Sequence, residues 1–146
     1  MKVLVCYTSK HGATEKYMQW LAETLHADLK RFDEIDRKYD FSDYDTVVVS
    51  SGTYASFMAL NKFLKHHWKE LQRKRVVVVA VGASPAEDPW SHKSYNRIPD
   101  HIRDGISYIK IMGETPEKAR PDDYQSPVVR ENLDAVISLI KQTSSN

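Results

Sequence analysis

A short apolar run that breaks into a glycine-bearing loop and then enters a helical pattern constrains this chain more than any other feature. Val3–Tyr7 is rich in β-forming residues and too short for a helix, whereas Glu15–His26 carries apolar residues at helical spacing. Between them lies Thr8–Glu15. A buried strand that leads through such a loop into a helix directs backbone N–H groups and the helix N-terminus at one spot, where an anion can sit. The pattern predicts a phosphate-binding loop.

Several side chains of this loop suit an anion. Ser9 and Thr14 add hydroxyl donors, and Gly12 lets the backbone come close to a ligand. Lys10 is the only cation in the loop, and its charge either neutralises the phosphate or points into solvent. His11 could donate a hydrogen bond to the same ligand. The alternative is that Ser9, His11 or Thr14 only caps the helix that follows.

The rest of the chain alternates between apolar runs and amphipathic stretches, which predicts a parallel sheet with helices on both faces. Further strands are expected at Ala27–Phe32, Asp45–Ser50, Arg75–Gly82 and Ile106–Met112. Helices are expected at Ser56–Leu71, at Ile98–Arg103 and from Ser126-Pro127 to Ile140, with loops at Asp33–Tyr44, Ala83–Arg97 and Glu114–Gln125, and with Thr143–Asn146 frayed. Charged residues within Ala27–Phe32 favour an edge position for that strand.

These elements predict an α/β fold, a doubly wound five-stranded parallel sheet in the order 2-1-3-4-5 that forms one domain over residues 1–146. Sheets of this kind bind ligands beyond the carboxyl ends of their strands, where the winding reverses. That crevice falls between the strand that ends at Tyr7 and the strand that ends at Ser50, and the loop after Val81 reaches it as well.

Composition excludes several classes of protein. The 21 Lys and Arg residues nearly balance the 20 Asp and Glu residues, so no global field indicates nucleic acid as a partner. The one cysteine, Cys6, excludes an intrachain disulfide and reads as an inert core thiol. There is no signal-peptide pattern and no run long enough to span a membrane, which leads us to expect a cytoplasmic protein. No zinc motif, catalytic triad or Walker loop is present, and the adjacent His66 and His67 lack metal-ligand spacing.

The loop sequence resembles a known family. Tyr7–Glu15 reads YTSKHGATE, which is similar to the FMN-phosphate loop of flavodoxins, Ser/Thr-x-Thr-Gly-x-Thr, with His11 where a threonine is usual. Its Ser-Lys-x-Gly-x-Thr form, together with Arg97–Asp104, resembles the flavodoxin-domain proteins related to menaquinone-dependent protoporphyrinogen dehydrogenase. The resemblance implies a flavodoxin-like three-layer sandwich that binds FMN noncovalently. The phosphate would then be held by Ser9, Lys10, His11, Gly12, Ala13 and Thr14.

The resemblance also assigns the flavin ring to two further loops. In the second, Ser51, Gly52, Thr53 and Tyr54 are the expected contacts, with Tyr54 either stacked on the ring or packed against the following helix. Ala55 replaces a glycine that is common after the aromatic, and alanine resists the positive φ that a flipped peptide needs. This substitution argues against the usual stabilisation of the one-electron-reduced flavin. In the third loop the expected contacts are Gly82, Ala83, Ser84 and Trp90, the last either as a second stacking partner or as a surface anchor.

We therefore expect an FMN-binding redox protein that transfers electrons to or from a protein partner and has no catalytic side chain and no metal of its own. The basic region Lys62–Arg75 is either a solvated helix face or a docking surface for an acidic redox partner. The first alternative is a small FMN-dependent oxidoreductase of the protoporphyrinogen or quinone reductase type. That group carries a long hydrophobic insertion near the last strand, where Gly113–Gln125 is short and polar.

Two further readings belong to other classes of protein. A flavin-free interaction module remains an alternative, because a fold does not establish a function. A signalling domain of the response-regulator type needs an acidic phosphoacceptor where this chain has Ser50-Ser51, and this class is excluded.

Overall fold

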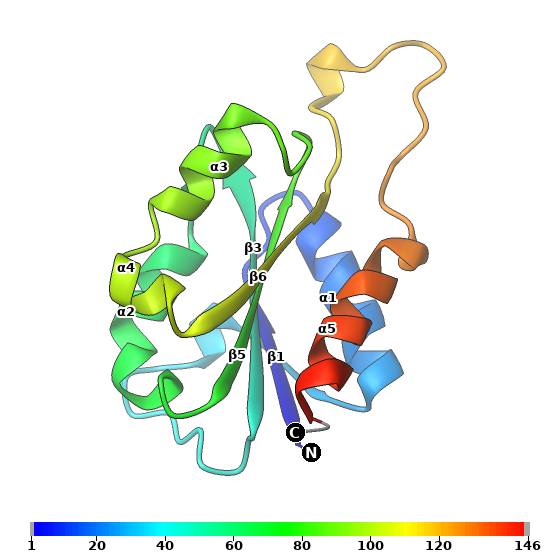
Figure 1. Ribbon diagram of the computed structural model, residues 1–146. Coiled ribbons are helices and arrows are strands. Elements are labelled where there is room, and N and C mark those ends of the chain that lie inside the picture. The colour runs from blue at the N-terminus through cyan, green and yellow to red at the C-terminus, as the bar shows by residue number, and fades with distance from the viewer. Residues whose placement is uncertain (1, 145–146) are drawn as a thin grey trace.

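The protein is built around a twisted parallel sheet, seen in the computed structural model, which describes residues 2–144 and side chains up to residue 142 (Figure 1). The parallel strands are β1 (Val3–Tyr7), β2 (Asp28–Arg31), β3 (Thr46–Tyr54), β5 (Arg75–Gly82) and β6 (Ile106–Met112). Their order is β2-β1-β3-β5-β6, and the two-residue strand β4 (Phe57–Met58) pairs antiparallel with β3. The order equals the predicted 2-1-3-4-5 once β4 is set aside, so the predicted fold class is confirmed.

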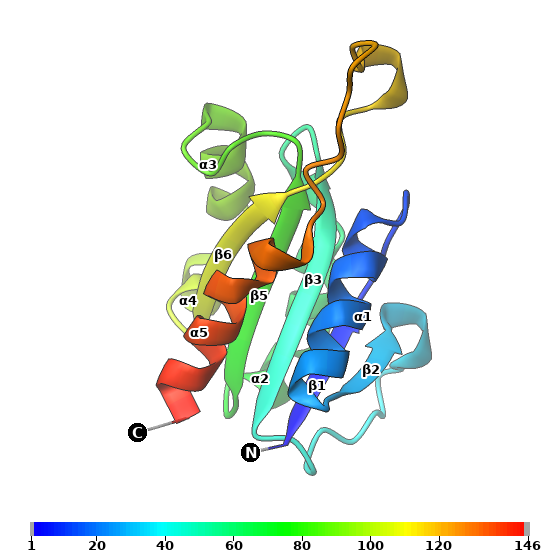
Figure 2. The ribbon, with the colours of Figure 1, turned by 90° about the vertical axis from the view of Figure 1, so that its right-hand side faces the viewer.

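Helices cover both faces of the sheet, as the two perpendicular views show (Figures 1 and 2). One face carries α1 (Ala13–Leu25) and α5 (Asp134–Ser144), and the other carries α2 (Leu60–Leu71), α3 (Pro89–Asn96) and α4 (Asp100–Arg103). Alternate residues of β1 serve the two cores: Val3 and Val5 face α1, whereas Leu4 and Cys6 face the core of α2. Burial on both faces explains why the central strands are continuous apolar runs.

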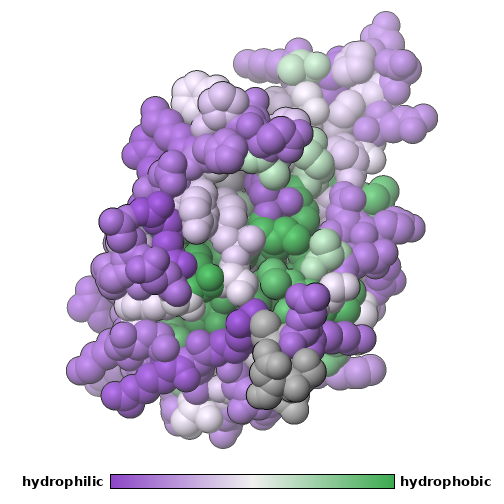
Figure 3. Space-filling model, in the orientation of Figure 1, coloured by the Kyte–Doolittle hydropathy of each residue, from purple (hydrophilic) through white to green (hydrophobic). Residues whose placement is uncertain are grey.

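The two edges of the sheet differ. Edge strand β2 carries Asp28, Lys30 and Arg31, as its charged sequence predicted, and none of its residues is fully buried. Edge strand β6 is mostly apolar, and Figure 3 shows an apolar surface over β6 between α4 and α5. Charges on an exposed edge oppose further strand pairing, and β6 carries only one charged residue, Lys110.

The predicted helix Ser56–Leu71 begins four residues too early. Leu60 is its first residue, and Phe57, which fits the apolar spacing of the helix, instead lies in β4 with 59% of its surface exposed. The chain makes a tight hairpin between β3 and β4 before it enters α2. The helical period of Phe57, Leu60 and Leu64 extends by chance into the hairpin.

The predicted loop Ala83–Arg97 is wrong in its second half, where α3 lies. The side chain of Asp88 accepts a hydrogen bond from the Trp90 N–H (2.8 Å), and Pro89 occupies the first helical turn. This start signal is legible in the sequence. The polar composition of the segment concealed it, because only Ser91 and Ser94 of this helix are buried. Pro99 precedes α4 as predicted for a short helix there.

The segment 113–129, here called the arm, projects beyond the carboxyl edge of the sheet (Figures 1 and 2). It is the predicted loop with one 3-10 turn, Glu117–Ala119. The expected start of the last helix at Ser126-Pro127 is wrong, because a 3-10 turn at Arg130–Leu133 precedes α5. The Ser126 hydroxyl instead donates to the carboxylate of Glu114, which also accepts from the Tyr124 hydroxyl at 2.5 Å. The expected fraying of Thr143–Asn146 lies largely outside the described residues.

The segment Asp33–Tyr44, predicted to be polar and connective, contributes to the core. Ile35, Phe41 and Tyr44 are buried beside α2. The ring of Phe41 contacts His67 edge-on at a centroid distance of 5.5 Å. Apolar residues at irregular spacing in a loop give no periodic signal, and sequence analysis passes over them.

Candidate functional site

Three loops meet at the carboxyl edge of the sheet, where the neighbouring strands β1, β3 and β5 end. The first loop follows Tyr7, the second is the β3–β4 hairpin and the third follows Gly82. The Thr8 N–H donates to the Ser50 carbonyl (3.2 Å), which ties the first loop to the strand that carries the second. The winding reverses between β1 and β3, which is where the sequence predicts that a ligand binds.

Gly12 shapes the first loop. It is the N-cap of α1 with φ 96°, a left-handed conformation that glycine adopts without strain. Its N–H donates to the Ser9 hydroxyl oxygen at 3.1 Å. No side chain caps α1, so the alternative in which Ser9, His11 or Thr14 caps this helix is wrong.

An uncapped helix start leaves N–H groups directed out of the first turn. A Cβ built on Gly12 meets no atom within 4 Å, so the space beside this turn is open. Glycine is needed at this position because of its positive φ and because it leaves the helix start open to a ligand, whereas packing does not require it. Both properties fit an anion held at the start of α1.

The other side chains of the first loop divide into two groups. Thr14 is 2% exposed, which turns its hydroxyl toward the protein, and Ala13 is half-buried. Lys10 and His11 are exposed and lie against Tyr54 of the second loop. The Lys10 ammonium is 5.4 Å from the centre of the Tyr54 ring, and the His11 ring meets that ring edge-on at 6.0 Å. The first and second loops therefore touch through side chains that sequence analysis assigned to separate ends of a ligand.

A cavity of about 180 Å³ opens beside the first loop, toward β2. The Tyr7 hydroxyl donates to the Glu15 carboxylate (3.0 Å) in its wall. Burial raises the pKa of Tyr7 to about 12, with further contributions from this hydrogen bond and from the charge of Glu15. The lining residues are Tyr7, Thr8, Ser9, Glu15, Arg31 and Asp33. Arg31 and Asp33 come from the end of β2, and sequence analysis gave no reason to bring them here.

The second loop turns through two non-glycine residues with positive φ. Ala55 has φ 48° and Ser56 has φ 76° between the paired residues Tyr54 and Phe57. A two-residue hairpin in which both central residues have positive φ normally uses Asn-Gly or a similar pair. Alanine was expected to resist this conformation, and the structure shows that Ala55 adopts it nonetheless.

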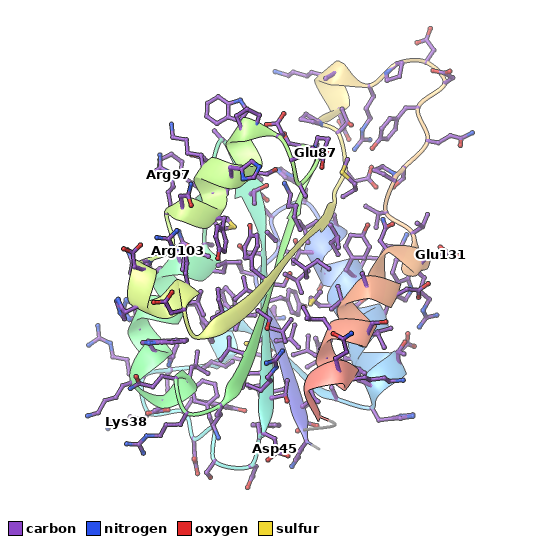
Figure 4. The ribbon with its side chains drawn as sticks, viewed as in Figure 1. Lys38, Asp45, Glu87, Arg97, Arg103 and Glu131 are labelled. Carbon is purple, nitrogen blue, oxygen red and sulfur yellow. The ribbon has the colours of Figure 1, made fainter. Side chains whose placement is uncertain are left out.

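Arg97, at the end of α3, holds the strained hairpin from outside. Its Nε donates to the Ser56 hydroxyl (2.9 Å), and its guanidinium lies 4.0 Å from the centre of the Phe57 ring. Ser56 is 2% exposed and Arg97 is exposed, so this hydrogen bond is partly shielded from water. Figure 4 shows Arg97 and Glu87 toward the carboxyl edge and Lys38 and Asp45 at the opposite end of the molecule. Strain of this kind persists where the surroundings hold it in place.

The predicted ring contacts of the second loop differ in exposure. Tyr54 is 42% exposed and folds back over Gly52, where a Cβ would stand 2.9 Å from the tyrosine oxygen. Partial burial raises the pKa of Tyr54. Ser51 is fully buried, and its hydroxyl oxygen accepts from the Leu60 N–H (3.2 Å) at the start of α2. The Thr53 hydroxyl donates to the Val81 carbonyl at 3.4 Å.

The third loop begins at Gly82, which is buried, and continues through exposed Ala83 and half-buried Ser84. The ammonium group of Lys110, on β6, donates to the Ser84 carbonyl at 2.9 Å. Trp90 in the first turn of α3 is 53% exposed, with the ammonium of Lys93 at 5.3 Å from its ring.

Most of the predicted basic region Lys62–Arg75 is an exposed face of α2 and the turn after it, on which Lys62, Lys65, His66, Lys69 and Arg73 lie. His67 is buried between Phe41 and Phe63, and burial lowers its pKa. Arg73 follows the far end of α2, next to the amino end of β5, away from the three loops. Lys62, which is exposed, lies at the start of α2, near the second loop.

Sequence analysis missed two cations that reach the loops, Arg97 and Lys110. The predicted alternation of the last strand puts Lys110 on the same face of the sheet as Tyr108, which is the face that α2, α3 and α4 cover. The sequence therefore does indicate that Lys110 lies on a covered face of the sheet. Nothing in the sequence announces the Arg97 contact, because it depends on a hairpin that lacks turn residues. Among residues 2–144, no group of metal-binding side chains is found, and no helix is long and apolar enough to cross a membrane.

A doubly wound sheet with an uncapped helix start at its switch point defines the class of α/β proteins that bind phosphate-bearing ligands at the carboxyl edge. Residues 4–115 match the family model described as flavodoxin domain. The chain therefore belongs to the flavodoxin-domain family.

Solved structures agree with the family match. Oxidised flavodoxin 2 from Bacillus cereus is 18% identical with a TM-score of 0.61, over 97% of this chain and 99% of that one. A flavoprotein from Bacteroides uniformis described as putative is 16% identical with a TM-score of 0.61, over 94% of this chain and 97% of that one. A flavoprotein from Lactobacillus acidophilus, solved in complex with FMN, is 17% identical with a TM-score of 0.50, over 76% and 91% of the two chains. At these identities the likeness concerns the fold. No curated protein matches the sequence.

Proposed function

We propose that this protein binds FMN noncovalently, with the phosphate at the first loop and the flavin ring between the second and third loops. The observation that carries the proposal is the uncapped start of α1 behind Gly12, at the switch point of the sheet. Membership of the flavodoxin-domain family and the FMN-bound Lactobacillus acidophilus flavoprotein support it.

In this proposal each loop has its own task. The backbone of Lys10–Thr14 and the Ser9 hydroxyl bind the phosphate, and Lys10 supplies a compensating charge. Tyr54 stacks on the ring, which requires that its contacts with Lys10 and His11 rearrange. Backbone groups of Gly82–Ser84 bind the ring from the other side, and Trp90 is a further candidate contact.

We propose electron transfer to or from a protein partner as the function. Bound flavin would supply the redox chemistry, and the chain would bind it, orient it and set its electrostatic surroundings. A small FMN-dependent oxidoreductase of the protoporphyrinogen or quinone reductase type is the alternative. That activity needs a pocket that holds a substrate against the ring. The arm is the neighbouring segment long enough to form its wall, but residues 116–123 are exposed and mostly polar.

Ligand comparison tests the binding proposal. Purified protein reconstituted with FMN should quench flavin fluorescence and stay yellow through desalting, whereas riboflavin, which lacks the phosphate, should bind far more weakly. Ser9→Ala should weaken FMN binding and leave riboflavin binding unchanged. Ser42→Ala, an exposed serine at the amino end of the sheet, is the matched control. Equal affinity of the wild type for FMN and riboflavin would refute the phosphate loop.

Reduction kinetics separate the carrier from the enzyme. A flavoprotein reductase should reduce the bound flavin at a rate that falls with salt, because exposed charges are screened over about 8–10 Å at moderate ionic strength. Lys62→Glu, near the second loop, should slow this reaction more than Arg73→Glu at the far end of α2. Rapid, salt-independent turnover of a quinone or porphyrinogen by the isolated protein would favour the oxidoreductase.

A further inference from the structure

Lys110 has no place in the expected flavin site, yet it connects the last strand to the third loop. It pairs in register with Ala80, and its ammonium group donates to the Ser84 carbonyl (2.9 Å) and the Ser91 hydroxyl oxygen (2.7 Å). The Ser91 hydroxyl in turn donates to the Pro85 carbonyl at 2.8 Å. Lys110 therefore binds one backbone carbonyl of the third loop directly and is connected to a second through the Ser91 hydroxyl in the first turn of α3.

The charge of Lys110 has no carboxylate in contact. Its side chain is half-buried, and none of the ion pairs found among residues 2–144 includes it. Burial lowers the pKa of Lys110, and the charge of Asp88 opposes this effect. A half-buried cation that touches only neutral oxygens has lost hydration without gaining an ion pair. Lys110 thus places a positive charge under the carboxyl edge of the sheet, on which the charge of Asp88 acts without direct contact.

Packing around Gly82 leaves this arrangement little freedom. A Cβ at Gly82 would lie 2.1 Å from the Thr53 hydroxyl oxygen and 3.2 Å from Cε of Lys110. The first residue of the third loop is thus in close contact with the second loop on one side and with the Lys110 stem on the other. A change in Lys110 is transmitted to residues that the proposed flavin site uses.

We propose that Lys110 is a positioning residue of this site, which holds the third loop in its binding shape and favours the more negatively charged, fully reduced form of FMN over the oxidised form. The inference rests on the proposed function. A positive charge in a poorly hydrated place stabilises an added negative charge nearby more strongly than it would in water.

Lys110→Met tests both parts, because methionine keeps much of the stem and removes the charge and the donors. Lys74→Met is the matched control, since Lys74 is also half-buried and also donates to a backbone carbonyl, that of Tyr44 at 2.8 Å, but at the amino end of the sheet. Binding of oxidised FMN, riboflavin and anaerobically reduced FMN is measured for both variants. We expect Lys110→Met to weaken oxidised FMN and riboflavin by the same factor, about tenfold. Reduced FMN should lose about threefold more.

Lys110→Arg keeps the charge, and we expect it to retain the wild-type ratio of affinities for reduced and oxidised FMN even where its larger group weakens both. Lys74→Met should bind all three ligands as the wild type does. Unchanged affinities in Lys110→Met, or equal losses for reduced and oxidised FMN, would overturn the inference.

Hydrogen exchange in the ligand-free protein separates failure of this inference from failure of the proposed function. Lys110→Met should speed exchange of backbone amides in Ala83–Ser91, and Lys74→Met should leave them unchanged. If the wild type binds no FMN, the proposed function fails and the site role of Lys110 falls with it. If the wild type binds FMN and exchange in Ala83–Ser91 is the same in Lys110→Met, the positioning role is refuted by itself.

Discussion

The two ends of the sheet differ in backbone strain and in open helix N–H groups, although the buried Nε atoms of Arg75 and Arg103, near the amino end, also have no hydrogen-bond partner. At the carboxyl edge, α1 starts without a side-chain cap, and Ala55 and Ser56 have positive φ. At the amino edge, the Lys2 N–H donates to the Asp45 carboxylate (3.0 Å) and the Lys74 ammonium donates to the Tyr44 carbonyl (2.8 Å).

A non-glycine residue with positive φ also occurs at the amino edge, but there it serves the helix. His26 (φ 53°) ends α1 as its C-cap, and its N–H meets the carbonyls of Ala22 and Glu23. We infer that the amino half stabilises the fold and that the carboxyl edge retains open donors and strain for ligand binding. Strain and unsatisfied groups that are useful for binding lower the stability of the fold. Substitutions at the amino end should therefore change stability more than ligand affinity, and removal of ligand contacts at the carboxyl edge should change ligand affinity more than stability.

Phe41→Ala should have the largest effect on stability. Phe41 is 2% exposed and packs against His67 near the amino end of the sheet. Loss of a buried phenylalanine side chain costs about 3–5 kcal/mol, from lost burial and the cavity left behind. Urea unfolding measures this loss, and FMN affinity of the folded fraction should be unchanged. A variant of normal stability with weakened FMN binding would contradict the division between the two ends.

Tyr54→Ala should produce the converse result. FMN binding should weaken by roughly 1–3 kcal/mol through lost stacking and burial, as fluorescence titration would show. The free energy of unfolding should change by less than about 0.5 kcal/mol, because the side chain is largely at the surface. Trp90→Ala then reports whether a second aromatic covers the ring. Wild-type affinity in the Tyr54 variant would mean that this side chain only packs against the protein.

Ala55→Gly should stabilise the protein by about 0.5–1 kcal/mol. A left-handed conformation costs a non-glycine residue about 1–2 kcal/mol, and the greater freedom of glycine in the unfolded chain offsets part of the gain. Gly12→Ala is the opposite change, since it imposes backbone strain on alanine at φ 96° without any packing contact to disturb. Thermal unfolding measures both. A loss of stability in Ala55→Gly would show that the hairpin is not strained.

The smallest effect is a dependence of stability on pH through His67. Burial lowers its pKa below the ordinary value of 6.5, so just below pH 6.5 the unfolded chain binds more protons than the folded one. Stability should therefore fall as pH drops below about 6.5, the ordinary histidine value. His67→Gln should reduce this slope in urea unfolding at several pH values. His66→Gln, on the exposed side of α2, should change it much less, because burial and not the charge of His66 is the main cause of the lowered His67 pKa.

Much of the fold could be predicted from the sequence, because apolar runs that are buried on both faces identify strands. Val76–Val81 could hardly be anything else, and the charges of Asp28–Arg31 located an edge. The first loop was predicted on similar grounds, because a glycine between a strand and a helix indicates a tight turn with positive φ. In each case a local pattern and the fold required the same residue type.

The remaining errors share a physical cause, which is that distant contacts override the local pattern. Ala55 and Ser56 carry no turn signal, since Arg97, about forty residues away, holds their hairpin. Ser126 resembles a helix N-cap, but its hydroxyl is engaged by Glu114 across the arm. The strand pattern places Lys110 on the face of Tyr108, but its hydrogen bond to the Ser84 carbonyl depends on how the third loop folds.

The buried thiol of Cys6 offers a way to measure how often the interior of the sheet opens. Cys6 is fully buried in β1, its thiol donates to the Val48 carbonyl (3.2 Å), and burial raises its pKa far above the ordinary range. As the only cysteine of the chain, it can react with an alkylating reagent only when β1 separates from its neighbours. The rate of labelling would therefore report how often β1, the strand that leads into the first loop, opens. Any ligand that closes that loop should lower this rate.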